Sequence, residues 1–204
     1  MANRYTLTEQ QKTVDIYLKG CVNLYGYVTP RQFLKIYNRY NTPKILKEDL
    51  LKWADKLERK TDNYAIYTNA IINTRVSDEK ISEIIYYQNG KTYYTPTAQE
   101  ITAYSTPNYY AKTKQTEELY NFVTKELKIS TLIANIFIKN LEWSIRIEEP
   151  MQAQNNLMER HGIIPKDIVQ ARSLLNKIQN INNSTRKWAN CGYTPQELFK
   201  SSKD

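Results

Sequence analysis

The chain has 204 residues and a net charge of +8, and 41% of its residues are hydrophobic, which fits one large or two small folded domains and excludes a disordered tail. No apolar run approaches the roughly 20 residues of a membrane-crossing helix, and no N-terminal segment is typical of a signal peptide. Two cysteines, Cys21 and Cys191, are too few for a disulfide framework or a cysteine-ligated zinc, so we expect a cytoplasmic protein that contacts no membrane.

The first two helices are predicted from their N-terminal caps. Thr8 followed by Gln11 is a capping box, and apolar residues recur after it at helical spacing up to Gly26. An extended pair, residues 27–28, comes next. Thr29 and Pro30 then supply an N-cap and a first-turn proline for a second helix.

A third helix and a β-hairpin complete the first 73 residues. The third helix, residues 46–60, has an apolar stripe that consists of Leu46, Leu50, Leu51, Ala54 and Leu57. Two short β-prone runs between residues 63 and 73 flank Thr68 and Asn69, which predicts a hairpin with its turn at this pair.

This order of three helices and a hairpin resembles the winged helix-turn-helix family. The resemblance implies that residues 46–60 enter the major groove of DNA and that the hairpin touches the backbone or minor groove. Lysines suit phosphate contacts, whereas Arg59 is the residue on this helix suited to a base edge. The nucleic-acid-binding residues predicted in this way are Arg31, Arg39, Lys44, Lys47, Lys52, Lys56, Arg59, Lys60 and Asn69.

The middle of the chain is rich in tyrosine. Ser77 caps a predicted helix, and Thr97 with Glu100 forms a capping box for another. Tyrosine is favoured at interfaces and in base stacking, although half-buried packing is the preferred explanation of such rings. The candidate partner-binding rings are Tyr86, Tyr87, Tyr93, Tyr94, Tyr109 and Tyr110.

From residue 116 onward the chain is predicted to be helical, with amphipathic stripes that form a core or a homodimer interface. The stripes comprise Leu132, Ile133, Ile136, Phe137 and Leu141, and then Ile168, Val169, Leu174, Leu175 and Ile178.

The last segment, residues 182–198, reads Asn-Asn-x-Thr-Arg-x-Trp-x-x-x-Gly-x-Thr-Pro-x-Glu-Leu. It resembles a C-terminal segment of uncharacterised bacterial proteins, some of which carry a SEC-C zinc motif that is absent from this chain. Arg186 and Trp188 are candidates for partner binding, or alternatively for a structural clasp onto the helical domain.

Catalytic residues are scarce. The one histidine, His161, precedes Gly162 and is interpreted as the polar end of a helix. The densest acidic cluster, Glu142, Glu148 and Glu149, has no metal-nuclease spacing and is interpreted as a solvated helix end. We predict no enzymatic activity, no metal and no cofactor.

Basic charge is concentrated at the two ends of the chain. Residues 11–60 hold 11 Lys and Arg against 5 Asp and Glu, and residues 161–204 hold seven against three. Such asymmetry favours an anionic partner, although it also serves solubility.

The sequence therefore predicts a mainly α protein with a winged-helix-like domain over residues 1–76 and a helical domain over residues 77–204. The favoured function is binding to double-stranded DNA, and we expect DNA as the partner before RNA. The protein would then act as a regulator or as a mobile-element accessory protein. The alternative is a protein-binding inhibitor or adaptor, for example one that a phage directs against a nucleic-acid-guided defence complex.

Overall fold

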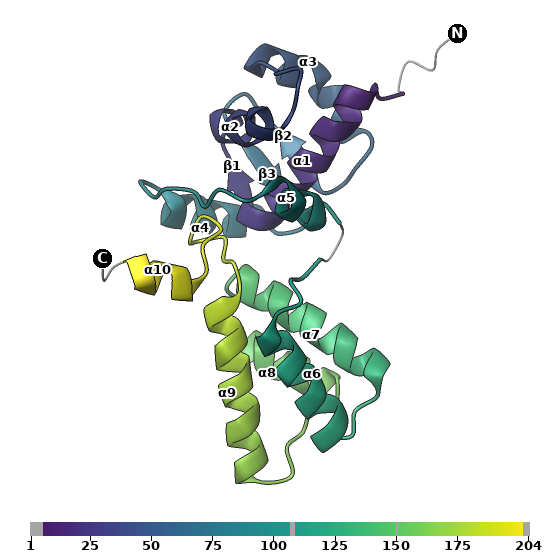
Figure 1. Cartoon of the computed structure of the whole chain (residues 1–204), viewed down its shortest axis with the longest axis vertical. Coiled ribbons are helices and arrows are strands. Elements are labelled where there is room, and N and C mark those ends of the chain that lie inside the picture. The colour runs from purple at the N-terminus through teal and green to yellow at the C-terminus, as the bar shows by residue number, and fades with distance from the viewer. Residues whose placement is uncertain (1–5, 107–108, 150, 202–204) are drawn as a thin grey trace. The chain divides into compact units, whose positions relative to one another are not determined.

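The computed structural model describes residues 6–106, 109–149 and 151–201. Residues 1–5, the start of the segment considered for a signal peptide, lie outside these ranges. The described chain is mainly helical, with a small three-stranded antiparallel sheet (Figure 1). It divides into two compact units, Met1–Pro107 and Asn108–Asp204, which we call unit 1 and unit 2.

Unit 1 contains the sheet and the helices that surround it. In chain order its elements are α1 (Glu9–Tyr25), β1 (Tyr27–Val28), α2 (Pro30–Tyr40), α3 (Lys47–Glu58), β2 (Tyr64–Ile66), β3 (Ile71–Asn73), α4 (Asp78–Gln88) and α5 (Ala98–Tyr104). The strand order is β1-β3-β2, and Ile72 of the central strand lies opposite Tyr27 on one side and Ala65 on the other.

The helix caps and the hairpin turn of unit 1 form as the local sequence predicts. The Gln11 N–H donates to the Thr8 hydroxyl while the Thr8 N–H donates to the Gln11 side chain, which completes the capping box of α1. The Tyr67 N–H donates to the Ala70 carbonyl at 2.7 Å and closes the hairpin over residues 68–69. The prediction for Leu46 is wrong: it precedes α3 as the N-cap residue and is 65% exposed.

Helices α4 and α5 pack within unit 1, whereas the sequence analysis assigned their residues to the second domain. Gly20 on α1 explains how closely α5 approaches, because a Cβ atom there would lie 2.4 Å from the Ile101 carbonyl oxygen. Buried side-chain amides also form hydrogen bonds that connect α1 with α5 and α4 with α1. Asn23 donates to the Tyr104 carbonyl at 2.8 Å, and Gln88 donates to the Tyr25 carbonyl at 2.7 Å. Residues 78–104 therefore complete the core of unit 1.

Unit 2 is helical throughout the part that the structure describes. Its elements are α6 (Lys114–Asn121), a π-helical turn η1 (Phe122–Glu126), α7 (Thr131–Arg146), α8 (Met151–Arg160), α9 (Ile168–Ser184) and α10 (Pro195–Ser201). Its core includes Phe137 and Leu141 of α7 and Leu174 and Ile178 of α9.

The amphipathic stripes of unit 2 are wider than the core that they cover. The core interpretation is wrong for several of their members, because each helix contacts its neighbours along only part of its apolar face. The exposed members are Leu132 (70%), Ile133 (38%), Ile136 (41%), Ile168 (66%), Val169 (73%) and Leu175 (52%). None of the helices within the described ranges is long and apolar enough to cross a bilayer.

Candidate nucleic-acid interface

The outward face of α3 carries carboxylates among its lysines. Lys47, Lys52 and the flanking Arg59 are exposed, as the resemblance to a winged helix requires. Asp55 lies on the same face and pairs with Arg59 at 3.0 Å across one helical turn. Glu48 is exposed near the start of the helix and adds a second negative charge. The positive potential of this face is therefore weaker than its lysine content alone indicates.

The predicted residues of α2 and the following loop have different surroundings. Arg31 is exposed in the first turn of α2. Arg39, near the opposite end, lies over the Tyr40 ring at 5.7 Å, and the Lys44 ammonium donates to the Asn38 carbonyl. Of these three cations, Arg31 is the one that the structure brings close to α3 and the hairpin.

One hollow of about 440 Å³ gathers predicted residues from three elements. Arg31 comes from α2, Lys47 from α3 and Asn69 from the hairpin turn. Thr29, Pro30 and Leu34 supply the remaining lining, and the surface of the hollow is mainly apolar. No carboxylate lines the described part of this hollow, so Arg31 and Lys47 are the charges that an approaching ligand meets.

A second groove of about 690 Å³ continues from the same arginine. Its cations are Arg31 and Lys35 on α2 and Lys91, which follows α4, and its other lining residues are Thr29, Gln32, Thr92 and Tyr93. The sequence patterns do not single out Lys35 and Lys91. Lys35 is one helical turn after Arg31, so its position on the same helix face is visible in the sequence. Lys91 lies beyond the predicted domain boundary at residue 76, so the sequence does not connect it with α2.

The four candidate tyrosines of unit 1 differ in their exposure. Tyr86 and Tyr87 on α4 are 78% and 46% exposed and meet edge to face at 5.6 Å. Tyr93 donates to Gln88 at 2.7 Å, and its ring packs edge to face against Tyr25 within unit 1.

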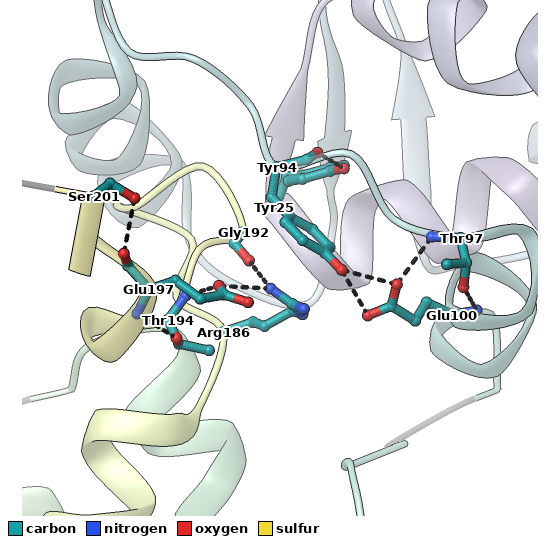
Figure 2. A network of polar contacts seen from close by, with 9 residues as sticks. All are labelled: Tyr25, Tyr94, Thr97, Glu100, Arg186, Gly192, Thr194, Glu197 and Ser201. Atoms are coloured by element: carbon teal, nitrogen blue, oxygen red, sulfur yellow. Dashed lines mark hydrogen bonds and ion pairs between the residues drawn. The ribbon is translucent and has the colours of Figure 1, made fainter. Parts of the chain in front are cut away.

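Tyr94, Tyr109 and Tyr110 are the other three candidate tyrosines, and all three are half-buried. Figure 2 shows the Tyr94 hydroxyl on the Glu100 carboxylate, with O···O distances of 3.0 and 2.9 Å. Tyr109 and Tyr110 lie in unit 2 and are half-buried, and burial raises the pKa of Tyr110. Of the six candidate tyrosines, Tyr86 and Tyr87 are therefore the most available to a partner.

The segment over residues 182–198 folds as a clasp within unit 2. Trp188 is completely buried, and its ring meets Trp143 edge to face at 5.4 Å. Figure 2 shows that Arg186 donates to the Gly192 carbonyl and to Glu197, each at 3.0 Å. The partner-binding prediction is corrected for Trp188, because a ring with no exposed surface packs in the core. Arg186 bonds to residues of its own segment, and its role in partner binding stays a prediction.

The predicted solvated helix end is wrong for Glu142, the member of the acidic cluster that lies on α7. Glu142 and Arg146 are 4% and 1% exposed, and they form a buried ion pair at 2.7 Å. Burial raises the pKa of Glu142, and the Arg146 charge opposes that rise in part. Glu148 instead pairs with Lys187 of the clasp at 3.3 Å.

No group of three or more metal-ligating His, Cys, Asp or Glu side chains is present among the described residues. His161 follows α8, and its ring contacts Phe137 edge to face at 6.2 Å. Cys21 and Cys191 are both buried, and burial raises the pKa of the Cys21 thiol, which keeps it protonated. The charged grooves of unit 1 therefore remain the best candidate for a functional site.

In comparisons with known proteins, no protein-family model, no curated protein and no solved structure matches the chain.

Proposed function

We propose that unit 1 is a winged helix-turn-helix that binds double-stranded DNA without catalysing a reaction. Its element order and the strand order β1-β3-β2 support this assignment. The observation that carries the proposal is the hollow where Arg31, Lys47 and Asn69 meet. It joins α2, α3 and the hairpin turn around two cations, and a protein that binds a phosphate backbone needs cations of this kind on several elements.

The test is the salt dependence of duplex binding. We expect the protein to bind a random 30-base-pair duplex in fluorescence anisotropy, with an affinity that falls steeply as salt rises. Replacing Lys47, Lys52 and Lys56 by Gln removes up to three phosphate contacts from α3. The slope of log K against log salt should then become shallower by about 2.7, at about 0.9 per phosphate contact.

A matched control separates local contacts from net charge. The variant K12Q/K80Q/K114Q also removes three positive charges, but each of these lysines is paired with a carboxylate on its own helix, and none of them is among the described lining residues of the grooves. It should keep the wild-type slope. No duplex binding at low salt, or equal slopes for the two triple variants, would contradict the proposal.

A second candidate function, binding to a protein partner, rests on α4. Ile85, Tyr86 and Tyr87 are consecutive and exposed, which is typical of an aromatic contact patch. A Tyr86→Ser/Tyr87→Ser variant that loses a partner while keeping duplex affinity would favour this function.

A further inference from the structure

We propose that the groove between α2 and the segment after α4 binds the phosphate backbone of the same DNA. The inference rests on the proposed DNA-binding function and extends it beyond the α3–hairpin region. The groove is lined by Lys35 and Lys91, with Arg31 shared between it and the adjacent hollow. No carboxylate lines its described walls, so an approaching phosphate meets three positive charges.

The kind of cation indicates which part of DNA this groove takes. Lys35 and Lys91 are exposed, and lysine presents a compact charge on a flexible stem. Such a side chain follows phosphates, whereas base edges are better read by the fixed donors of Arg, Asn or Gln. The groove therefore strengthens binding and adds little sequence preference.

The aromatic lining argues for a duplex over a single strand. Single-strand grooves combine cations with rings on which successive bases stack. Among the described residues that line this groove, Tyr93 is the one aromatic, and its hydroxyl is bonded to Gln88 while its ring packs against Tyr25. A ring held in this way offers no series of stacking platforms, so the charges fit an intact backbone.

Arg31 is shared by the two hollows, which therefore lie next to each other. It lines the hollow that contains Lys47 and also the groove that contains Lys35, and Thr29 at the N-terminus of α2 lines both. A phosphate strand that contacts Lys47 can therefore continue past Arg31 towards Lys35 and Lys91. The DNA contact thereby extends onto residues 91–93, outside the first 76 residues.

The experiment removes only the two cations that belong to this groove alone. We expect K35Q/K91Q to reduce the slope of log K against log salt by about 1.8 on the 30-base-pair duplex. K35R/K91R should restore the wild-type slope, because the charges return. K12Q/K80Q, with the same change in net charge, should leave the slope unchanged, and thermal melting should show that all variants are folded.

The outcomes separate this inference from the proposed function. If the wild type binds duplex and K47Q/K52Q/K56Q weakens its salt dependence while K35Q/K91Q does not, the groove inference fails and DNA binding by α3 stands. If K35Q/K91Q loses only the binding of inorganic phosphate, measured by calorimetry, the groove is a small-anion site and the inference is again overturned. A reduced duplex slope with arginine rescue supports it.

Discussion

The two basic ends of the chain use their cations in opposite ways. In unit 1, Arg31 and Lys35 are exposed and line grooves that hold no carboxylate in their described walls. In unit 2, the side chains of Arg186 and Lys187 are only 15% and 13% exposed, and each is paired with a carboxylate. An excess of Lys and Arg therefore indicates a binding surface only where burial and pairing leave the charges facing solvent.

The difference has a physical cause in the cost of removing charge from water. A buried guanidinium must be paired and hydrogen-bonded, because desolvation without a partner costs several kcal/mol. Arg186 and Lys187 of unit 2 meet this requirement and stabilise the fold. Arg31 and Lys35 in the grooves of unit 1 stay exposed and available to an anionic ligand.

The largest effect that we expect comes from Arg146→Met in unit 2. The substitution leaves Glu142 buried without its ion-pair partner and removes the bond from Arg146 to the Tyr109 carbonyl. Breaking a buried pair in this way should lower the free energy of unfolding by about 3–5 kcal/mol at pH 7. Urea denaturation measures this loss.

The loss of unfolding free energy in Arg146→Met should be larger at neutral pH than at acidic pH. Burial already raises the pKa of Glu142, and loss of Arg146 raises it further. A buried carboxyl with a raised pKa in the folded state destabilises the fold only when it is ionised. The free energy of unfolding is therefore higher at low pH and falls as pH rises through that pKa. The gap between wild type and variant should therefore narrow from pH 7 towards pH 4.5. A constant gap would show that lost packing, and not the unpaired buried charge of Glu142, causes the loss.

Local signals in the sequence predicted most of the elements of unit 1. Caps at Thr8, Thr29 and Thr97 depend on neighbours three residues away, and a short window contains that information. The position of α5 depends on Gly20 meeting Ile101, a contact 81 residues apart in sequence that no local pattern encodes. This explains why the predicted boundary at residue 76 differs from the observed division after residue 107.

The sequence also predicts individual site residues better than their arrangement, because the grooves join residues that are far apart in the chain. Arg31, Lys47 and Asn69 were predicted individually, but only the fold places them around one hollow. Lys91 was missed because its groove partner is on α2. The Glu142–Arg146 pair was readable as an i,i+4 spacing, but its burial depends on how α7 packs within unit 2.

A smaller effect is expected at the clasp. Arg186→Met removes the bonds from Arg186 to the Gly192 carbonyl and to Glu197. Because Glu197 is partly exposed, we expect a loss of roughly 1–2 kcal/mol in unfolding free energy, measured by denaturant titration. Duplex affinity should stay at the wild-type value. A stable variant with weaker DNA binding would instead assign Arg186 to the DNA contact and would break the contrast between the two ends.

The smallest effect is expected from Asp55→Asn on α3. Its ion pair with Arg59 has side chains 78% and 56% exposed, and such pairs contribute about 0–1 kcal/mol, so unfolding free energy should change very little. The substitution also removes a negative charge from the face proposed to meet phosphates, and duplex affinity at low salt should rise about two- to fivefold. Glu117→Gln in unit 2 is a matched control, because it removes one exposed carboxylate outside unit 1. Equal gains in affinity from both substitutions would mean that net charge governs binding and that α3 does not face the DNA.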